Sequence, residues 1–324
     1  MKNKLLGVIS LGCSKNRLDT EGMLYALLQN GFEITEELDQ ADLLIANTCS
    51  FIQSAKEESI EAILQAGEIK SQKEGCKLLV TGCLPERYRE ELARELPEVD
   101  AFVGVNQYGK IVDIVNRMFE GERIAEFVER AALPLGRVRT TPKHLAYVRI
   151  AEGCDHACAY CAIPSIRGPY RSRPMEEIIE ECKHLIADGA KEIVLIAQDT
   201  SYYGKDLYGG FCLSKLLQKI DTLGAQWVRI LYAYPERITD ELLSTIVKSK
   251  SILPYLDLPL QHVNDEILRA MGRPTTQKKL RELLTKIHNT GKEFTLRTTF
   301  ITGFPGETEE QFEELTDFVK QGYF

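Results

Sequence analysis

Long apolar runs and an excess of basic charge are both missing from this chain of 324 residues. No stretch approaches the roughly eighteen apolar residues of a membrane-spanning helix, and the short apolar run near the N-terminus has no cleavage site after it. The formal net charge is −8, whereas non-specific binding to nucleic-acid phosphates rests on clustered Lys and Arg. We therefore expect a cytoplasmic protein with no membrane partner, for which a basic partner is better suited than a bare phosphate surface.

The cysteines indicate bound metal or redox chemistry. There are nine, an odd number, and in a reducing cytoplasm metal, cluster or redox roles explain them better than disulfides. Cys154, Cys158 and Cys161 have C-x3-C-x2-C spacing, so one short loop can direct three thiolates to one centre and leave a coordination position open. Zinc is the alternative, although zinc modules more often pair two such elements or add histidines. The nearby His156 is predicted to be structural or solvent-facing.

Apolar segments alternate with helix-like segments in the first part of the chain, which predicts a doubly wound parallel sheet. Predicted strands cover residues 4–11, 41–48 and 77–82, and predicted helices cover residues 19–30, 54–70 and 86–96. Cys13, Cys49 and Cys83 each follow one of these strands. Ligands bind at that edge of open parallel sheets, so we expect the three thiols to converge. Cys76, Cys182 and Cys212 lack such placement and are predicted to be incidental buried residues.

The periodicity fades between about residues 124 and 144, which contain two prolines. We therefore predict an N-terminal domain over 1–130, a linker over 131–142 and a second domain over 143–324. The second domain repeats the strand and helix alternation five or six times, which predicts a partial (β/α) barrel of the TIM type. Because the sequence ends directly after a predicted helix, we expect it to be shortened.

Further candidate residues lie at strand ends of the second domain. Gln198 ends the predicted strand 192–198 and Asp199 follows it, while Gly303 and Gly306 come after residues 294–302 of the last predicted strand. Glycines there either permit close backbone approach to a ligand or simply form a turn.

A basic run follows the cysteine loop and has two interpretations. It is either a solvated loop or a carboxylate-binding group, for which planar guanidinium groups are suited. The run contains Arg167, Arg171 and Arg173.

The cysteine loop, with the aromatic Tyr160 before its last cysteine, resembles the signature of the radical S-adenosylmethionine (SAM) enzymes. The resemblance implies that Cys154, Cys158 and Cys161 hold a 4Fe-4S cluster whose fourth iron is chelated by the amino and carboxylate groups of SAM. One electron from the cluster then cleaves SAM to a 5′-deoxyadenosyl radical. The cofactor contacts expected with it are Tyr160, Gln198, Asp199, Gly303 and Gly306.

Both halves together resemble the methylthiotransferases of the radical SAM superfamily. That resemblance implies a second, auxiliary 4Fe-4S cluster on Cys13 in LGCSKN, Cys49 in NTCSF and Cys83 in TGCLPE. One SAM would methylate sulfur held there, another would give the radical, and the substrate carbon would capture the methylated sulfur. An electron donor and a sulfur donor are also implied, and we expect a monomer.

Within that family, IPSIRGPYRSRP and AQDTSYYG resemble the RimO type, which modifies the β-carbon of an aspartate in small-subunit ribosomal protein number twelve. The alternative substrate is transfer RNA, the substrate of the MiaB and MtaB types, which usually have Asn where this chain has Asp199. Family members carry a C-terminal TRAM domain that engages substrate, and these 324 residues contain no counterpart. A radical enzyme whose N-terminal cysteines only transfer electrons, and a non-enzymatic zinc module, are the remaining alternatives.

Overall fold

The computed structural model describes residues 3–127 and 136–324. The chain divides into two compact units, one formed by Met1–Thr140 with Ser165–Gly168 and the other by Thr141–Pro164 with Pro169–Phe324. The predicted linker, 131–142, falls partly outside the described residues. The segment Ser165–Gly168, which follows the cysteine loop in sequence, packs with the first unit. Among the described residues, no helix is both long and apolar enough to cross a membrane.

The first unit is built on a parallel sheet of six strands in the order β2-β1-β3-β4-β5-β6. The strands are β1 (Lys4–Ser10), β2 (Phe32–Ile34), β3 (Leu43–Thr48), β4 (Lys77–Gly82), β5 (Ala101–Val103) and β6 (Ile124–Glu126). The order reverses direction between β1 and β3, the point at which ligands of doubly wound sheets bind. Every residue of β3 is buried, as expected of a central strand covered on both faces.

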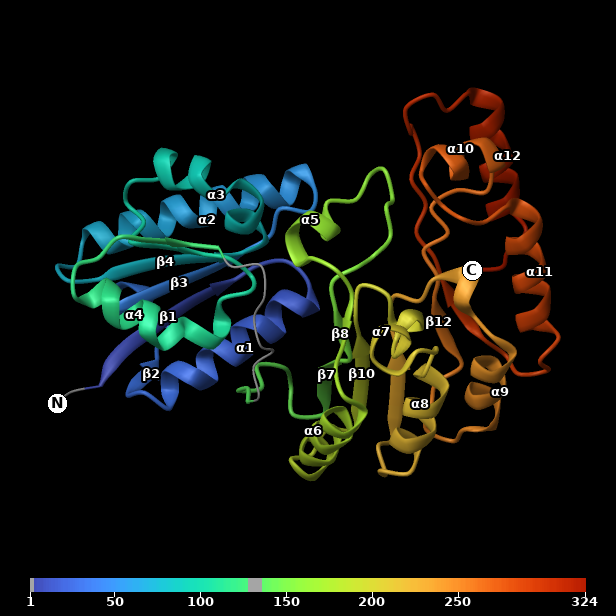
Figure 1. Ribbon diagram of the computed structural model, residues 1–324, viewed down its shortest axis with the longest axis horizontal. Coiled ribbons are helices and arrows are strands. Elements are labelled where there is room, and N and C mark those ends of the chain that lie inside the picture. Colours follow the sequence, from blue (N-terminus) through green and yellow to red (C-terminus); the bar gives the residue numbers. More distant parts are fainter. Residues whose placement is uncertain (1–2, 128–135) are drawn as a thin grey trace. The chain divides into compact units, whose positions relative to one another are not determined.

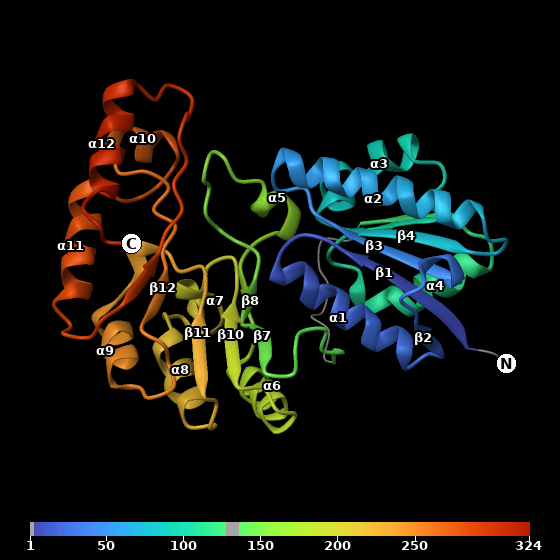
Figure 2. The ribbon, with the colours of Figure 1, turned by 180° about the vertical axis from the view of Figure 1, so that it is seen from behind.

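Among the residues that the structure describes, four α-helices cover this sheet, with α2 and α3 on one face and α1 and α4 on the other (Figures 1 and 2). They are α1 (Ser14–Leu28), α2 (Gln53–Ser71), α3 (Cys83–Glu95) and α4 (Ile111–Phe119), with short 3-10 helices η1 (Leu38–Gln40) and η2 (Tyr108–Lys110). The doubly wound fold is therefore confirmed. The sequence did not indicate β2, β5, β6 or α4, and it placed the start of α1 five residues too late.

The second unit contains five parallel strands that follow one another in chain order. β7 pairs with β10 and β10 with β11, an isolated bridge joins Val228 to Ile252, and β12 pairs with β13. This is the expected partial barrel. The strands are β7 (Leu145–Arg149), β10 (Glu192–Ile196), β11 (Trp227–Ile230), β12 (Tyr255–Asp257) and β13 (Thr295–Arg297), with a small antiparallel ladder of β8 (Ala151–Glu152) and β9 (Arg171–Ser172).

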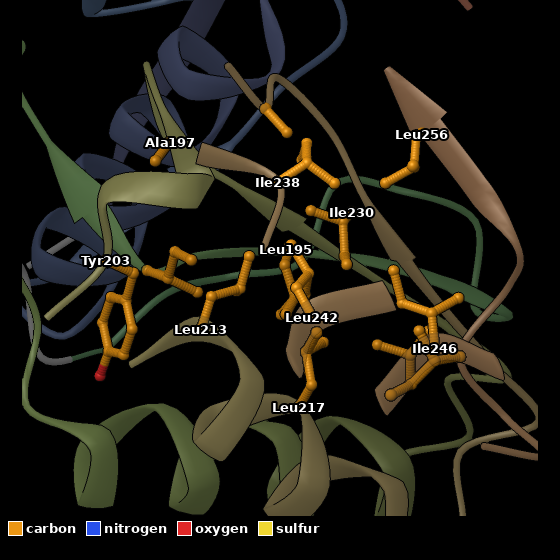
Figure 3. Close-up of a cluster of buried hydrophobic side chains, with 14 of the residues drawn as sticks. Leu195, Ala197, Tyr203, Leu213, Leu217, Ile230, Ile238, Leu242, Ile246 and Leu256 are labelled. Carbon is orange, nitrogen blue, oxygen red and sulfur yellow. The ribbon is translucent and has the colours of Figure 1, made fainter. Parts of the chain in front are cut away.

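Helices alternate with these strands, and all but the first of them, which from Ser165 onward packs with the first unit, belong to the second unit. They are α5 (Ile163–Arg167), α6 (Met175–Ala187), α7 (Lys205–Tyr208), α8 (Leu213–Asp221), α9 (Asp240–Lys248), α10 (Asp265–Ala270), α11 (Gln277–His288) and α12 (Glu309–Val319), with 3-10 turns η3 (Thr200–Tyr202) and η4 (Pro235–Arg237). Figure 3 shows Leu195, Ile230 and Leu256 from the strands packed with Leu217 and Ile246 from the helices. This apolar core leaves the strand ends and their loops to carry the site.

Candidate metal-cluster and cofactor sites

The three N-terminal cysteines meet at one edge of the first sheet. Cys13 follows β1, Cys49 follows β3 and Cys83 follows β4, and these strands are neighbours in the sheet. A Cβ atom placed on Gly12 would lie only 2.9 Å from Cβ of Cys49. Burial raises the pKa of Cys83 to about 11, and negative charge on either of the other two thiols adds to that rise. The structure therefore brings the three thiols together.

Two glycines allow this close approach of the strand ends. Gly12 and Gly82 have φ of +87° and +101°, values that L-residues with side chains rarely adopt. A Cβ on Gly82 would lie 2.4 Å from both Oδ1 of Asn47 and the carbonyl oxygen of Thr48. Only glycine therefore lets the chain turn sharply out of β4 while it stays against the end of β3.

Asn16, in the first turn of α1, links the three cysteine loops. Its side chain is fully buried. Nδ2 donates to the carbonyl oxygens of Leu11 and Thr48 at 3.3 and 2.8 Å, and Oδ1 lies 3.5 Å from Sγ of Cys83. One amide side chain thus contacts the segments that carry all three thiols.

Arg167 supplies a buried positive charge at this site. It belongs to the segment Ser165–Gly168 of the first unit, and its guanidinium donates to Oδ2 of Asp19 at 2.7 Å, to Oδ1 of Asn16 at 2.5 Å and to Sγ of Cys83 at 3.6 Å. The Arg167 charge lowers the pKa of Cys83 against the larger effect of burial. A cation here would stabilise thiolate or any anionic group that the thiols hold.

Helix termini add to the positive potential. Cys13 is the N-cap residue of α1 and Cys83 is the first residue of α3, and neither helix has a side-chain cap. The N-terminal N–H groups of a helix favour negative charge and thiolate. The backbone and Arg167 together make this edge of the sheet suited to an anionic metal–thiolate group.

The second unit holds the other three cysteines in a folded loop. Cys154 and Cys158 are buried and Cys161 is half-buried. The amide of Cys161 donates to the carbonyl oxygen of Cys158 at 3.0 Å, the amide of Ile163 donates to Sγ of Cys161 at 3.5 Å, and the hydroxyl of Tyr234 lies 3.6 Å from Sγ of Cys158. Burial raises the pKa of Cys154 to about 11, so metal binding to this loop must release protons at neutral pH.

The segment after α10 forms a wall for this loop. The amide of Ala159 donates to the carbonyl oxygen of Met271 at 3.0 Å. Gly272 has φ of +72°, and a Cβ there would lie 2.8 Å from the carbonyl oxygen of Ala157. The cysteine loop is therefore held by backbone contacts from a segment more than one hundred residues away in sequence.

Asp199 and His156 form a polar cluster beside the loop. The Asp199 carboxylate accepts from the amide and hydroxyl of Ser201 at 3.0 and 2.5 Å, lies 3.2 Å from Nε2 of His156, and pairs with Arg237. The His156 ring stacks on Tyr234 with centroids 3.9 Å apart. Of the two roles expected for His156, structural and solvent-facing, these contacts favour the structural one. The expected cofactor contact of Asp199 stays a prediction, since its carboxylate is already engaged by three side chains.

Gln198 and Tyr160 are two more of the residues expected to contact the cofactor. Nε2 of Gln198 donates to Oε1 of Glu152 at 2.5 Å, whereas Oε1 of Gln198 is buried and has no hydrogen-bond partner among the described residues. Such an acceptor fits a ligand N–H or ammonium group. Tyr160 is half-buried, and burial, followed by the neighbouring Cys158, raises the pKa of its hydroxyl. Their roles as cofactor contacts remain predictions.

The loop after β13 is organised as a turn. Gly303 and Gly306 are exposed and have φ of +70° and +90°, and a Cβ added to either would have no atom within 4 Å. Glu307 fixes the loop, because it accepts from the amide of Phe304 at 2.9 Å and lies 3.1 Å from Nε2 of the buried His262. The glycines are thus required by backbone conformation, and the space beside them is open.

The donor sets fit iron–sulfur clusters. Within residues 3–127 and 136–324, no three His, Cys, Asp or Glu side chains gather closely enough to hold a single metal ion. A 4Fe-4S cluster does not require that, because each thiolate binds a different iron. Three thiols without a fourth cysteine would leave one iron of such a cluster open in each site. The remaining cysteines, Cys76, Cys182 and Cys212, are buried at other places in the two units.

Several residues of these sites escaped the sequence reasoning. Three of them, Asn16, Tyr234 and Arg237, belong to no motif whose spacing points to a metal site. Asn16 alone had a local hint, since it stands three residues after Cys13. Of the three arginines after the cysteine loop, Arg167 is buried against Asp19 and Arg173 pairs with Glu181.

Comparisons with known proteins agree with both halves of this description. The family model of the radical SAM superfamily matches residues 148–319, and that of "Uncharacterized protein family UPF0004" matches residues 6–104. The ribosomal protein uS12 methylthiotransferase RimO of Thermoanaerobacter sp. (strain X514) is 45% identical over 328 residues, covering 100% of this chain and 74% of the relative. The protein of the same name from Desulforamulus reducens is 47% identical over 324 residues, covering 98% and 73%.

Solved structures show the same fold at low identity. The radical SAM methyltransferase TsrM from Kitasatospora setae, with tryptophan and a SAM analogue bound, superposes with a TM-score of 0.72 and 13% identity, covering 98% of this chain and 71% of that one. Another structure of TsrM, with cobalamin and a [4Fe-4S] cluster bound, gives a TM-score of 0.71 at 13% identity, covering 98% and 73%. At this identity the likeness concerns the fold alone.

Proposed function

Because the chain belongs to the RimO family of radical SAM methylthiotransferases, we propose that it inserts a methylthio group at the β-carbon of an aspartate in ribosomal protein uS12. The convergence of Cys13, Cys49 and Cys83 at the ends of β1, β3 and β4 carries this proposal. A cysteine loop of the radical SAM type occurs in many reactions, whereas transfer of a sulfur group needs a second centre that holds the sulfur.

The radical SAM half uses SAM and a 4Fe-4S cluster, which Cys154, Cys158 and Cys161 would hold. When bound, these two groups supply a radical that can remove hydrogen from an unactivated C–H bond, which has no acidic proton for a general base. The chain's own part is to position them. Met271 and Gly272 fix the cysteine loop, and the buried Oε1 of Gln198 could accept from an N–H of the amino group of SAM.

The auxiliary cluster is part of the proposal and is supported by the donor set of the first unit. Its three thiols lie beside Arg167 and two helix N-termini, which would stabilise the negative charge of a thiolate-ligated cluster. Asn16 bonds the loops that carry these thiols and would hold them at fixed separations.

Three observations favour a ribosomal-protein substrate over transfer RNA. The relatives are named for ribosomal protein uS12, and the net charge of −8 suits a basic protein better than a polyanion. Asp199, which distinguishes this branch in sequence, pairs with Arg237 beside the cysteine loop. An asparagine there could not form that ion pair.

A two-substrate assay tests the proposal. The chain, loaded anaerobically with iron and sulfide, is incubated with SAM, a chemical reductant and either uS12 or transfer RNA. A gain of one methylthio group on uS12, located by mass spectrometry on an aspartate, is expected. Modification of transfer RNA without modification of uS12 would show that the substrate assignment is wrong, and colourless protein with stoichiometric zinc would eliminate radical chemistry.

A further inference from the structure

The hydroxyl of Tyr234 lies beside a thiol that the proposed cluster would use. It is 3.6 Å from Sγ of Cys158, and while both groups carry protons either one can donate. A thiolate bound to iron has no proton and can only accept. A phenol keeps its proton at neutral pH, since its ordinary pKa is about 10. With iron on Cys158, the hydrogen bond therefore runs from the Tyr234 hydroxyl to the sulfur.

Two neighbours hold the ring of Tyr234 in place. The His156 ring stacks on it, with centroids 3.9 Å apart and ring planes 2° from parallel. The guanidinium centre of Arg273 lies 4.1 Å from the centroid of the Tyr234 ring, a distance at which a cation is attracted to an aromatic face. Neither contact uses the hydroxyl. The faces of the ring are thus fixed, and its edge carries the donor to Cys158.

The backbone of Tyr234 is fixed as well. Its amide donates to Oγ of Ser201 at 3.1 Å, and that hydroxyl in turn donates to Oδ1 of Asp199 at 2.5 Å. Pro235 follows and favours extended backbone at Tyr234, which has φ of −86° and ψ of 131°. Because the ring and the backbone are both held, little conformational freedom remains to be lost when the hydroxyl donates to a thiolate.

Of the three thiols of the loop, Cys158 is the one that a side-chain hydroxyl contacts within the described residues. Cys161 accepts from the backbone amide of Ile163 at 3.5 Å, and Cys154 has a backbone hydrogen bond with His156. Backbone donors come with the fold of the loop, whereas a side-chain donor is present or absent according to one residue. Hydrogen bonds to the sulfurs are among the features that determine the reduction potential of a cluster.

We propose that Tyr234 raises the reduction potential of the cluster at this loop by donating a hydrogen bond to the thiolate of Cys158, an inference that rests on the proposed radical SAM function. Reduction moves one electron from the electron donor to the cluster and transfers no proton, since the phenol keeps its own. The sulfurs share the added negative charge, so the hydrogen bond is stronger in the reduced state and favours it. Tyr234 acts through Cys158 and is a positioning residue.

The test is a redox titration of the full chain, loaded with iron and sulfide, in the absence of SAM. Soluble mediators set the potential, and electron paramagnetic resonance (EPR) measures the reduced cluster. Tyr234→Phe keeps the ring and removes the hydroxyl. At a given potential its ratio of reduced to oxidised cluster is expected to be about tenfold lower, which for one electron is a potential about 59 mV lower.

The EPR signal that belongs to this loop is identified in a separate frozen sample. It is the signal that changes when SAM is added, because SAM would bind one iron of this cluster. Electron–nuclear double resonance of the reduced cluster in D2O gives a second measurement. The coupling of one exchangeable hydrogen should disappear in Tyr234→Phe, whereas a general effect on folding would not remove a single coupling.

Two other tyrosine variants serve as controls. Tyr255→Phe removes a half-buried hydroxyl at the start of β12, from a ring that also has an arginine over it, Arg229 at 4.8 Å. It should change the ratio by less than about twofold, since Tyr255 begins its strand and the site lies at the strand ends. Tyr160→Phe removes the other hydroxyl near Cys158. It should give a smaller fall than Tyr234→Phe, because among the described residues the Tyr234 hydroxyl has the hydrogen-bond geometry to this sulfur.

Each outcome bears on the proposal. An unchanged or raised potential in Tyr234→Phe would overturn it, as would an equal fall in Tyr255→Phe or a larger one in Tyr160→Phe. Loss of iron from Tyr234→Phe would show that the residue is needed to assemble the cluster, and this too would overturn it. If no EPR signal of the unsubstituted chain responds to SAM, the proposed radical SAM function itself fails, which is a separate result.

Discussion

At the scale of single residues, Arg167 and Asp19 form a buried ion pair in the first unit. The side chains are 3% and 0% exposed and 2.7 Å apart. Removal of one partner would leave a charge buried and uncompensated, which is costly, whereas replacement of both is far less so. The pair therefore holds the segment Ser165–Gly168 against α1 and places the guanidinium beside Cys83.

Arg167→Met should destabilise the first unit by about 3–5 kcal/mol, measured from urea unfolding of the metal-free chain. The double variant Arg167→Met/Asp19→Asn should recover part of that loss, since no charge remains buried. Arg94→Met is the control, because Arg94 and Glu95 form an exposed pair with side chains 75% and 67% accessible, and such pairs contribute about 0–1 kcal/mol. Similar losses for Arg94→Met and Arg167→Met would contradict this account.

At the scale of elements, the turn from β4 into α3 determines where Cys83 lies. Gly82 has φ of +101° and ψ of −156°, a region that is accessible essentially only to glycine. The adjacent end of β3 occupies the space a side chain would need. Conformation and packing both require glycine at this position.

Gly82→Ala is expected to destabilise the first unit and displace Cys83. Gly121→Ala is a matched control, because Gly121 also has positive φ, +96°, but has no atom within 4 Å of an added Cβ. Gly121→Ala should lower the free energy of unfolding by about 1–3 kcal/mol, through backbone strain alone. Gly82→Ala should lower it further, because the added Cβ also clashes with the end of β3. Urea unfolding gives the comparison. Equal losses of unfolding free energy in the two variants would show that the close contact between the ends of β3 and β4 does not require glycine.

The loop after β13 should depend on pH through Glu307. Burial opposes ionisation of this carboxyl, but hydrogen bonds from His262 and the Phe304 amide outweigh it and lower its pKa. Nδ1 of His262 accepts from the amide of Asn264 at 3.0 Å, so Nε2 carries the proton and donates to Glu307. A lowered folded-state pKa adds stability above the unfolded value of about 4.3, and this is lost as the pH falls through the folded value.

Glu307→Gln should therefore be less stable than the unsubstituted chain at pH 7, and the difference should narrow as the pH falls below about 4. Thermal unfolding of both proteins across this range measures it, since the contributions of other carboxyl groups cancel in the difference. A difference in stability between the two proteins that stays constant down to about pH 3 would show that the ionised carboxylate of Glu307 is not its source.

At the scale of the whole molecule, the two cysteine sites belong to units with separate cores. The apolar cluster of the first unit includes Leu44, Ile63 and Leu78, whereas that of the second includes Leu195 and Leu256. The two clusters of side chains share no residue among those described. Loss of a ligand in one unit should thus leave the other unit folded.

The proposed division of labour predicts distinct defects for single cysteine variants. Cys158→Ala should abolish SAM cleavage, whereas Cys49→Ala should still form 5′-deoxyadenosine but give no methylthio product. Each variant should retain about four of the roughly eight irons of a two-cluster protein. Chromatography measures 5′-deoxyadenosine and the methylthio product, and an iron assay measures the number of irons per chain. Loss of SAM cleavage in both variants would break the assignment of roles.

Several features of the fold and sites were predictable because they depend on local pattern. The apolar runs around β1, β3 and β4 indicated the parallel sheet, and the spacing of Cys154, Cys158 and Cys161 indicated the cysteine loop. Strands of three residues, such as β2, β5 and β6, were missed because so short a run has no readable period. The start of α1 was missed because its first turn is polar and has no side-chain cap, so Asn16 reads as a loop residue although it is buried.

The sequence by itself determined which residues could hold metal and at which strand ends they stand, because cysteine spacing and apolar periodicity are local properties. Only the tertiary structure decided their surroundings. Folding places Arg167 against Cys83 and Asn16 among the loops that carry the three thiols. It also places Arg273 over the ring of Tyr234, with two of its N–H groups lacking a hydrogen-bond partner among the described residues. These neighbours are distant in sequence, and the packing of each unit selects them by burial and by the requirement that buried polar groups find partners.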